Sequence, residues 1–231
     1  MPMGTDGRRF SPLRQGLTTT SHDQTPAGSP GGTVTERTGN IMNALTATTA
    51  PVRRNGLNLV DLQGLIDTIA TQPDNAGARF TVTTTWQGGT KTESRIDHWN
   101  FRNEELHRSH IVRTDEPLEL GGTDAHANPQ EVLMSALNAC MTVGYVAVAA
   151  LMGIDLEFLS IETEGELDLR GFLDLAPVNP GYDEVTYTVR IKAENATAEQ
   201  LEQLHAFVQK TSPNYANFAK PIALRSRLVI H

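Results

Sequence analysis

The segment that most constrains the fold is a helix predicted for residues 129–152, which is apolar around nearly its whole circumference. Asn128-Pro129, with Glu131 at the third helical position, is a typical helix start, and Gly153 is a typical helix end. The apolar side chains that leave no wide polar face are Leu133, Met134, Leu137, Met141, Val143, Val146, Val148, Leu151 and Met152. Such a helix must be enclosed on all sides. The sequence therefore predicts an obligate homodimer, in which a second copy of the helix completes the cover.

Shorter periodic segments on either side of this helix predict an α+β fold. A helix over residues 58–70 precedes three strands, and a capping box at Thr197 opens a further helix that Ser212-Pro213 closes. The predicted strands are residues 79–86, 92–99, 105–113, 159–169, 184–193 and 222–230. Their polar alternation is typical of antiparallel sheets with one wet face. We expect antiparallel sheets packed around a long central apolar helix.

The N-terminal part of the chain differs in composition from the rest. Residues 1–40 are rich in Gly, Ser, Thr and Pro and contain no aliphatic run. Such a segment cannot bury enough apolar surface to fold by itself. We predict a flexible arm over residues 1–55 and a folded domain over 56–231, in which 56–78 is an N-terminal helical extension and 79–231 the core.

Charge and cysteine content narrow the partners and the compartment. The formal net charge of −8 argues against nonspecific binding to nucleic acid or anionic lipid. The apolar run of residues 139–152 is too short to span a bilayer. One free thiol without a secretory signal fits a reducing compartment, so we expect a cytoplasmic protein without nucleic-acid or membrane partners.

Cys140, inside the long apolar helix, is the only cysteine of the 231 residues. A single thiol can form neither an intrachain disulfide nor, alone, a zinc site. It is therefore either a small core residue or a reactive group.

The residues around Cys140 resemble those of the OsmC/Ohr family. The resemblance rests on Gly121-Gly122, on Asn128-Pro129-Gln130-Glu131, and on the small and apolar residues that lead to Ala139-Cys140. Residues 153–155, Gly-Ile-Asp, and the order of the later strands and helix also fit, so the resemblance covers roughly residues 79–231. It implies an intertwined homodimer with active sites at the subunit interface, and thiol-based reduction of organic hydroperoxides.

The resemblance assigns the peroxidatic role to Cys140 but leaves two family positions altered. Ser212 stands where the family has its second, resolving cysteine, so the two-cysteine cycle is unavailable. Gln130 stands where the family has a glutamate, and the neighbouring Glu131 is explained as a helix-capping residue. We name Gln130, Glu131, Ser212 and Tyr145 as candidate substrate-binding residues, although Tyr145 also fits a core position.

A peroxidatic cysteine must be a thiolate, which requires a nearby cation, a helix N-terminus or a hydrogen bond. Cys140 lies too far into its helix for the helix dipole to help, because that effect fades within the first turn. Arg113 is the nearest strand-borne candidate, with Arg102 and Arg108 as alternatives. Ten helical residues span ~15 Å, so a group at position 130 cannot reach Cys140 of its own straight helix. A partner for the thiolate must come from another chain or another loop.

Two functions from different classes remain open. The first is a one-cysteine thiol-dependent peroxidase, in which an organic hydroperoxide oxidises Cys140 and an external thiol restores it. The second is a non-catalytic dimer that binds a small apolar ligand in an interfacial pocket. Neither requires a cofactor, and the histidines His98, His107 and His110 do not form a convincing metal site, because positions 107 and 110 face opposite sides of a strand.

Overall fold

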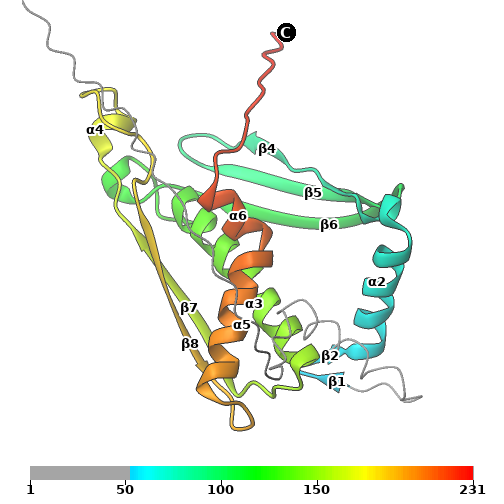
Figure 1. Ribbon diagram of the computed structural model, residues 1–231. Coiled ribbons are helices and arrows are strands. Elements are labelled where there is room, and N and C mark those ends of the chain that lie inside the picture. Colours follow the sequence, from blue (N-terminus) through cyan, green and yellow to red (C-terminus); the bar gives the residue numbers. More distant parts are fainter. Residues whose placement is uncertain (1–52, 231) are drawn as a thin grey trace, which may run out of the picture.

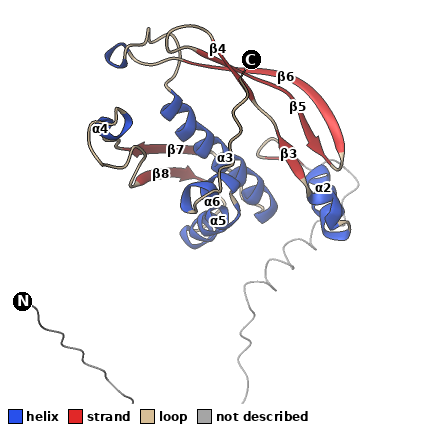
Figure 2. Ribbon diagram, turned by 90° about the horizontal axis from the view of Figure 1, so that it is seen from above, coloured by secondary structure: helices blue, strands red, loops and turns tan. Residues whose placement is uncertain are grey.

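The long helix predicted from the sequence forms the centre of the molecule. The computed structural model describes residues 53–230, and in it helix α3, Pro129–Met152, runs between a β-hairpin on one side and a larger sheet on the other (Figures 1 and 2). Asn128 caps the helix start in a capping box with Glu131, and Gly153 ends it with a left-handed backbone, φ 80°. Both predicted helix boundaries are confirmed.

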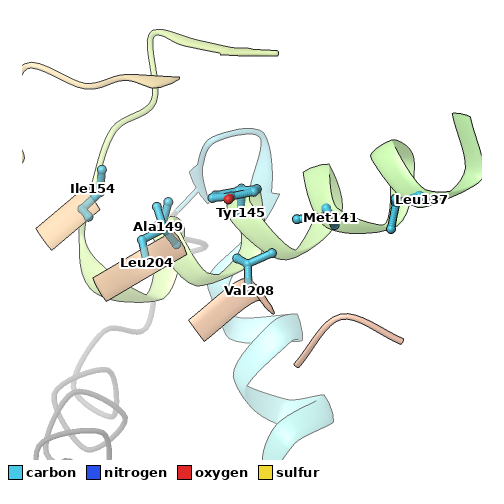
Figure 3. Close-up of a cluster of buried hydrophobic side chains, with 7 residues drawn as sticks. All are labelled: Leu137, Met141, Tyr145, Ala149, Ile154, Leu204 and Val208. Atoms are coloured by element: carbon cyan, nitrogen blue, oxygen red, sulfur yellow. The ribbon is translucent and has the colours of Figure 1, made fainter. Parts of the chain in front are cut away.

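One stripe of α3 forms the core. Leu137, Met141, Tyr145 and Ala149 recur every four residues, which places them on one face of the helix, and all are buried. Leu204 and Val208 of α5, Ala198–Thr211, pack against this stripe, and Ile154 closes its end (Figure 3). Gly144 allows the close approach, because a Cβ there would meet Val208 Cγ1 at 3.2 Å. By length and composition α3 is also apolar enough to cross a membrane, and one stripe of it packs against the rest of the described chain.

The larger sheet is antiparallel and contains four strands. Its strands are β3 Ala78–Phe80, β4 Thr83–Trp86, β5 Thr92–Phe101 and β6 Glu104–Thr114. The long β5 pairs with β3 and β4 along one edge and with β6 along the other, with an irregularity between Ile96 and His98. The segment predicted as a single strand over 79–86 is two short strands. Three aromatic rings of this sheet, Phe80, Trp99 and Phe101, are stacked in a row.

The second sheet is the hairpin of β7, Phe158–Gly165, and β8, Val185–Lys192, and α3 lies against β7. The strand predicted for 159–169 is wrong in its last part, because Asp168 caps a short helix, α4 Leu169–Phe172, within the connecting loop. Helix α6, Pro213–Ala219, follows α5 and packs on both α5 and α3. These observations confirm the α+β fold with antiparallel sheets and a long central helix.

A small hairpin at the start of the described residues is attached to the far end of α3. Its strands are β1 Arg53–Arg54 and β2 Leu57–Asn58, and helix α2, Leu59–Thr71, and a 3₁₀ turn, Pro73–Ala76, follow. The Asn55 amide donates to the Ile154 carbonyl and accepts from the Leu156 N–H, each at 2.9 Å. Most of the predicted arm, residues 1–55, lies outside the described residues, but the folded unit already includes Arg53–Asn55.

The strand predicted for residues 222–230 is wrong for the single chain. Residues 221–230 form no regular secondary structure, and the segment leads away from the helices (Figure 1). A strand requires backbone hydrogen bonds to a second strand, and within the described chain this segment has none. Its apolar side chains Ile222, Leu224, Leu228 and Ile230 are exposed as a result.

Large apolar side chains are also exposed elsewhere. Trp86 is 73% exposed, Phe80 66% and Val143, on α3, 68%. Exposed apolar side chains are therefore found on the large sheet, on α3 and on the C-terminal segment of the single chain.

Candidate functional site

The structure places Cys140 beside Ser212. The two residues are 72 positions apart, yet Cys140 Sγ lies 3.4 Å from Ser212 Oγ. Cys140 is partly exposed on α3, whereas Ser212 is only 5% exposed at the junction of α5 and α6. The resemblance assigns the family's two cysteines to these two positions, and in the structure the two side chains are neighbours.

Ser212 is held in place by its role at the start of α6. Its Oγ accepts a hydrogen bond from the Tyr215 N–H at 3.3 Å, and Pro213 occupies the first helical position. With the oxygen used as an acceptor, the hydroxyl proton is free to be donated to Cys140 Sγ. The sequence predicts a helix end at Ser212-Pro213. The same pair is also a typical helix start and could have predicted α6.

An open groove of about 740 Å³ lies next to this pair. Its walls come from the first half of α3, from α6, and from the start of β8 with the residues that precede it (Figure 1). Leu133, Ala136 and Leu137 line it on α3, and Cys140 is the next position along that helical stripe. Asn214 fixes α6 to α3 by donating to the Ala136 carbonyl at 2.8 Å. Cys140 does not itself line the groove, but its backbone lies only one helical turn, a rise of ~6 Å, beyond Ala136.

Of the other candidate binding residues, Gln130 lines the groove, whereas Ser212 contacts Cys140 and precedes the lining residues Asn214 and Tyr215. Glu131 instead accepts from the Asn128 N–H at 2.8 Å, so its carboxylate completes the helix cap, as the sequence indicated.

Tyr145 lies in the core rather than in the groove. It is 1% exposed, and its hydroxyl forms a hydrogen bond with His205 Nδ1 of α5. Burial, with a smaller contribution from Tyr187, raises the pKa of Tyr145 above its ordinary value, so the hydroxyl stays protonated. His205 was not identified from the sequence, because a histidine on an amphipathic helix gives no sign of its partner.

None of the three candidate arginines forms a hydrogen bond or an ion pair with Cys140 in the part of the chain that the structure describes. Arg113 donates to Glu93 Oε2 of the neighbouring strand from both Nε and Nη2, at 3.1 and 2.8 Å. Arg102 lies over the Phe101 ring and Arg108 over the Trp99 ring. The cation that the thiolate requires is therefore not supplied by these arginines within one chain.

The loop that enters α3 is organised by Asp115, which is fully buried. Its Oδ1 accepts from Thr90 Oγ1, and its Oδ2 accepts from Thr123 Oγ1 and from the backbone N–H groups of Thr123 and Ala125. The hydrogen bonds from the Thr123 and Thr90 hydroxyls hold the pKa of this carboxyl well below its usual range, against the opposing effect of burial. Asp115 was not predicted as a site residue, because its donors come from the folded loop and from Thr90 in the turn between β4 and β5.

Gly122 sits in the same loop and tolerates no side chain. A Cβ at this position would lie 1.8 Å from the Glu116 carbonyl oxygen. Within residues 53–230, no group of three or more His, Cys, Asp or Glu side chains could hold a metal ion.

Comparison with known proteins agrees with this arrangement. Residues 122–227 match the family model described as OsmC-like protein. No curated protein matches the sequence. Among solved structures, an OsmC-like protein from Mycoplasma pneumoniae is 15% identical over 61% of this chain and 87% of its own, with a TM-score of 0.48.

Two further solved structures are similar at the same low level. An OsmC-like protein of unknown function from Vibrio cholerae is 13% identical over 60% of this chain and 92% of its own, with a TM-score of 0.45. An organic hydroperoxide resistance protein OsmC from Legionella pneumophila is 18% identical over 59% and 88%, with a TM-score of 0.38. The matched segment begins at Gly122 and contains the capped start of α3, Cys140 and Ser212. Residues 122–227 thus form an OsmC-like domain.

Proposed function

We propose that this protein is a one-cysteine thiol-dependent peroxidase, which reduces organic hydroperoxides through Cys140 and is reset by an external thiol. The observation that carries the proposal is the position of Cys140, partly exposed, one helical turn beyond a groove and 3.4 Å from the buried Ser212 hydroxyl. A partly exposed thiol next to an open groove is accessible to a substrate. A serine at 212 can donate a hydrogen bond to the sulfur but cannot form a disulfide with it.

The proposed reaction has two steps. The Cys140 thiolate attacks the terminal oxygen of the hydroperoxide, an S–O bond forms, and the O–O bond breaks. The alkoxide takes up a proton and leaves as an alcohol, while Cys140 becomes a sulfenic acid. Two equivalents of an external thiol then reduce the sulfenic acid: the first forms a mixed disulfide and releases water, and the second restores Cys140 and leaves as a disulfide. A supply of free thiol agrees with the cytoplasmic location that we propose.

Oxidation of Cys140 by one equivalent of cumene hydroperoxide should give a sulfenic acid and no intramolecular bond. The reason is that Ser212 occupies the position from which a second sulfur would react. Mass spectrometry after trapping with a sulfenic-acid reagent should find the adduct on the peptide that contains Cys140. Addition of a small thiol in place of the reagent should give a mixed disulfide at the same residue.

A thiol that stays unmodified in excess hydroperoxide would contradict the peroxidase. The groove would then favour the alternative, a non-catalytic protein that binds a small apolar ligand. The 740 Å³ groove with apolar walls is the observation that supports this second function.

We also propose that the protein is an obligate homodimer. In a single chain α3 buries one stripe, while Val143 on another face is 68% exposed. Large apolar side chains of the four-stranded sheet are exposed as well. A second copy would cover these surfaces and would allow Arg113, held by Glu93 on the exposed sheet, to approach Cys140 of its partner. This arrangement would supply the cation that the thiolate requires.

Sedimentation velocity at low micromolar concentration should show a single species with the mass of two chains. Because the interface would be a divided core, its dissociation by dilution should coincide with loss of helical circular dichroism. A well-folded monomer at these concentrations would contradict both the dimer and any site assembled across it.

A further inference from the structure

The charged residues that line the groove are all negative. They are two adjacent carboxylates, Asp183 and Glu184, which stand just before β8. None of the described residues that line the groove is a lysine, arginine or histidine. Lys220 lies between the lining residues Ala219 and Ile222 without itself lining the groove.

The position of this pair is fixed by the surrounding loop. Asn179 donates to Asp183 Oδ1 at 2.7 Å and also to the Tyr182 carbonyl. The Tyr182 ring lies over Gly165, where a Cβ would come within 2.8 Å of it. Glu184 leads directly into β8, whose first residue, Val185, pairs with Gly165. The two carboxylates therefore belong to a constrained turn rather than to a freely moving loop.

The rest of the lining is apolar or uncharged. Leu133, Leu137, Val185 and Phe218 offer apolar surface, while Gln130 and Asn217 offer amides. A ligand with an apolar body and a neutral hydrogen-bonding group matches this lining. An anionic ligand finds no cation among the described lining residues of one chain and meets the two negative charges of Asp183 and Glu184.

We infer that the groove selects uncharged organic hydroperoxides over hydroperoxides that carry a carboxylate. The inference rests on the proposed function for the reaction at Cys140, but the selectivity belongs to the groove itself. Two carboxylates several ångströms from a bound anion, in largely aqueous surroundings, should disfavour it by about three- to tenfold at low ionic strength. Added salt should reduce this preference for the uncharged substrate, because Asp183 and Glu184 are exposed.

The test compares two substrates that differ only in charge: cumene hydroperoxide bearing a para carboxylate, and its methyl ester. Their rates with a free small thiol correct for intrinsic reactivity. We expect the protein to reduce the ester with a corrected kcat/KM about three- to tenfold higher, and this ratio to approach one in 0.5 M salt. Equal corrected rates at low salt, or a preference for the acid, would overturn the inference.

Two double variants locate the effect. Asp183→Asn with Glu184→Gln removes both charges from the groove lining and should bring the ratio of ester to acid kcat/KM close to one at low salt. Glu166→Gln with Asp174→Asn removes two exposed charges from the same β7–β8 connection outside the groove lining, and should leave the ratio unchanged. A ratio that persists in the first variant, or disappears in the second, would show that the selectivity arises elsewhere.

A binding measurement separates this inference from the proposed function. Calorimetry with the two alcohol products and the Cys140→Ser protein requires no turnover, and the ester alcohol should bind about three- to tenfold more tightly than the acid alcohol. Absence of turnover together with this difference would overturn the peroxidase and keep the selective groove. Equal binding of the two alcohols would overturn the selectivity even in an active enzyme.

Discussion

Cys140→Ser should lower kcat/KM for cumene hydroperoxide by a factor on the order of 10³ or more, because the variant loses the only sulfur that can accept the peroxide oxygen. A serine hydroxyl fits the same space and can still form a hydrogen bond with Ser212. The unfolding temperature should therefore change little. A coupled assay of thiol consumption measures the loss, and thermal unfolding checks the fold.

Ala139→Ser is the matched control. It adds the same hydroxyl one position earlier in α3, where the residue is exposed, and should keep most of the activity. Turnover by Cys140→Ser close to that of the unchanged protein would show that another group reduces the peroxide, and the proposed mechanism would be wrong.

Asp115→Asn should lower the unfolding temperature at pH 7 by about 5 °C or more. Both oxygens of the Asp115 carboxylate accept hydrogen bonds, whereas the amide of asparagine would place its NH₂ group against one set of these donors. The pKa of Asp115 is held below its ordinary value of 3.8. A carboxyl group whose pKa is lower in the folded than in the unfolded protein stabilises the fold at pH values above its unfolded-state pKa. This stabilisation is lost as the pH falls toward the folded-state pKa. The difference between the two proteins should thus be largest at neutral pH and shrink below about pH 4.

Thermal unfolding between pH 7 and pH 3 tests this behaviour. Glu119→Gln, in the 3₁₀ turn Leu118–Leu120 of the same loop, removes an exposed carboxylate and should have little effect at any of these pH values. A difference between Asp115→Asn and the unchanged protein that is independent of pH would mean that the hydrogen bonds do not favour the charged form.

The sequence predicted the elements whose signals are local. The capped start of α3 at Asn128 and its end at Gly153 follow from residues within one helical turn. The capping box at Thr197 is equally local, and the structure confirms it. The proximity of positions 140 and 212 followed from the family resemblance, since no local pattern connects residues 72 positions apart.

Features that depend on tertiary contacts were not predicted. The burial of Asp115 depends on Thr90, 25 residues earlier, and the groove depends on how α6 packs on α3. The strand predicted for 222–230 has the right alternation but no neighbouring strand in one chain. The contacts of Arg113 could not be derived either, because a strand residue has different neighbours in a monomer and in a dimer.

The link between Asn55 and the end of α3 has a consequence for the lifetime of the folded chain. Its two hydrogen bonds join residues 99 and 101 positions apart, so they require closure of a very long loop. Contacts of this kind form late, after the local helices and hairpins. Interactions absent from the folding transition state act on the rate of unfolding rather than on the rate of folding. We therefore expect the hairpin Arg53–Asn58 to slow the opening of the native state without hastening its formation.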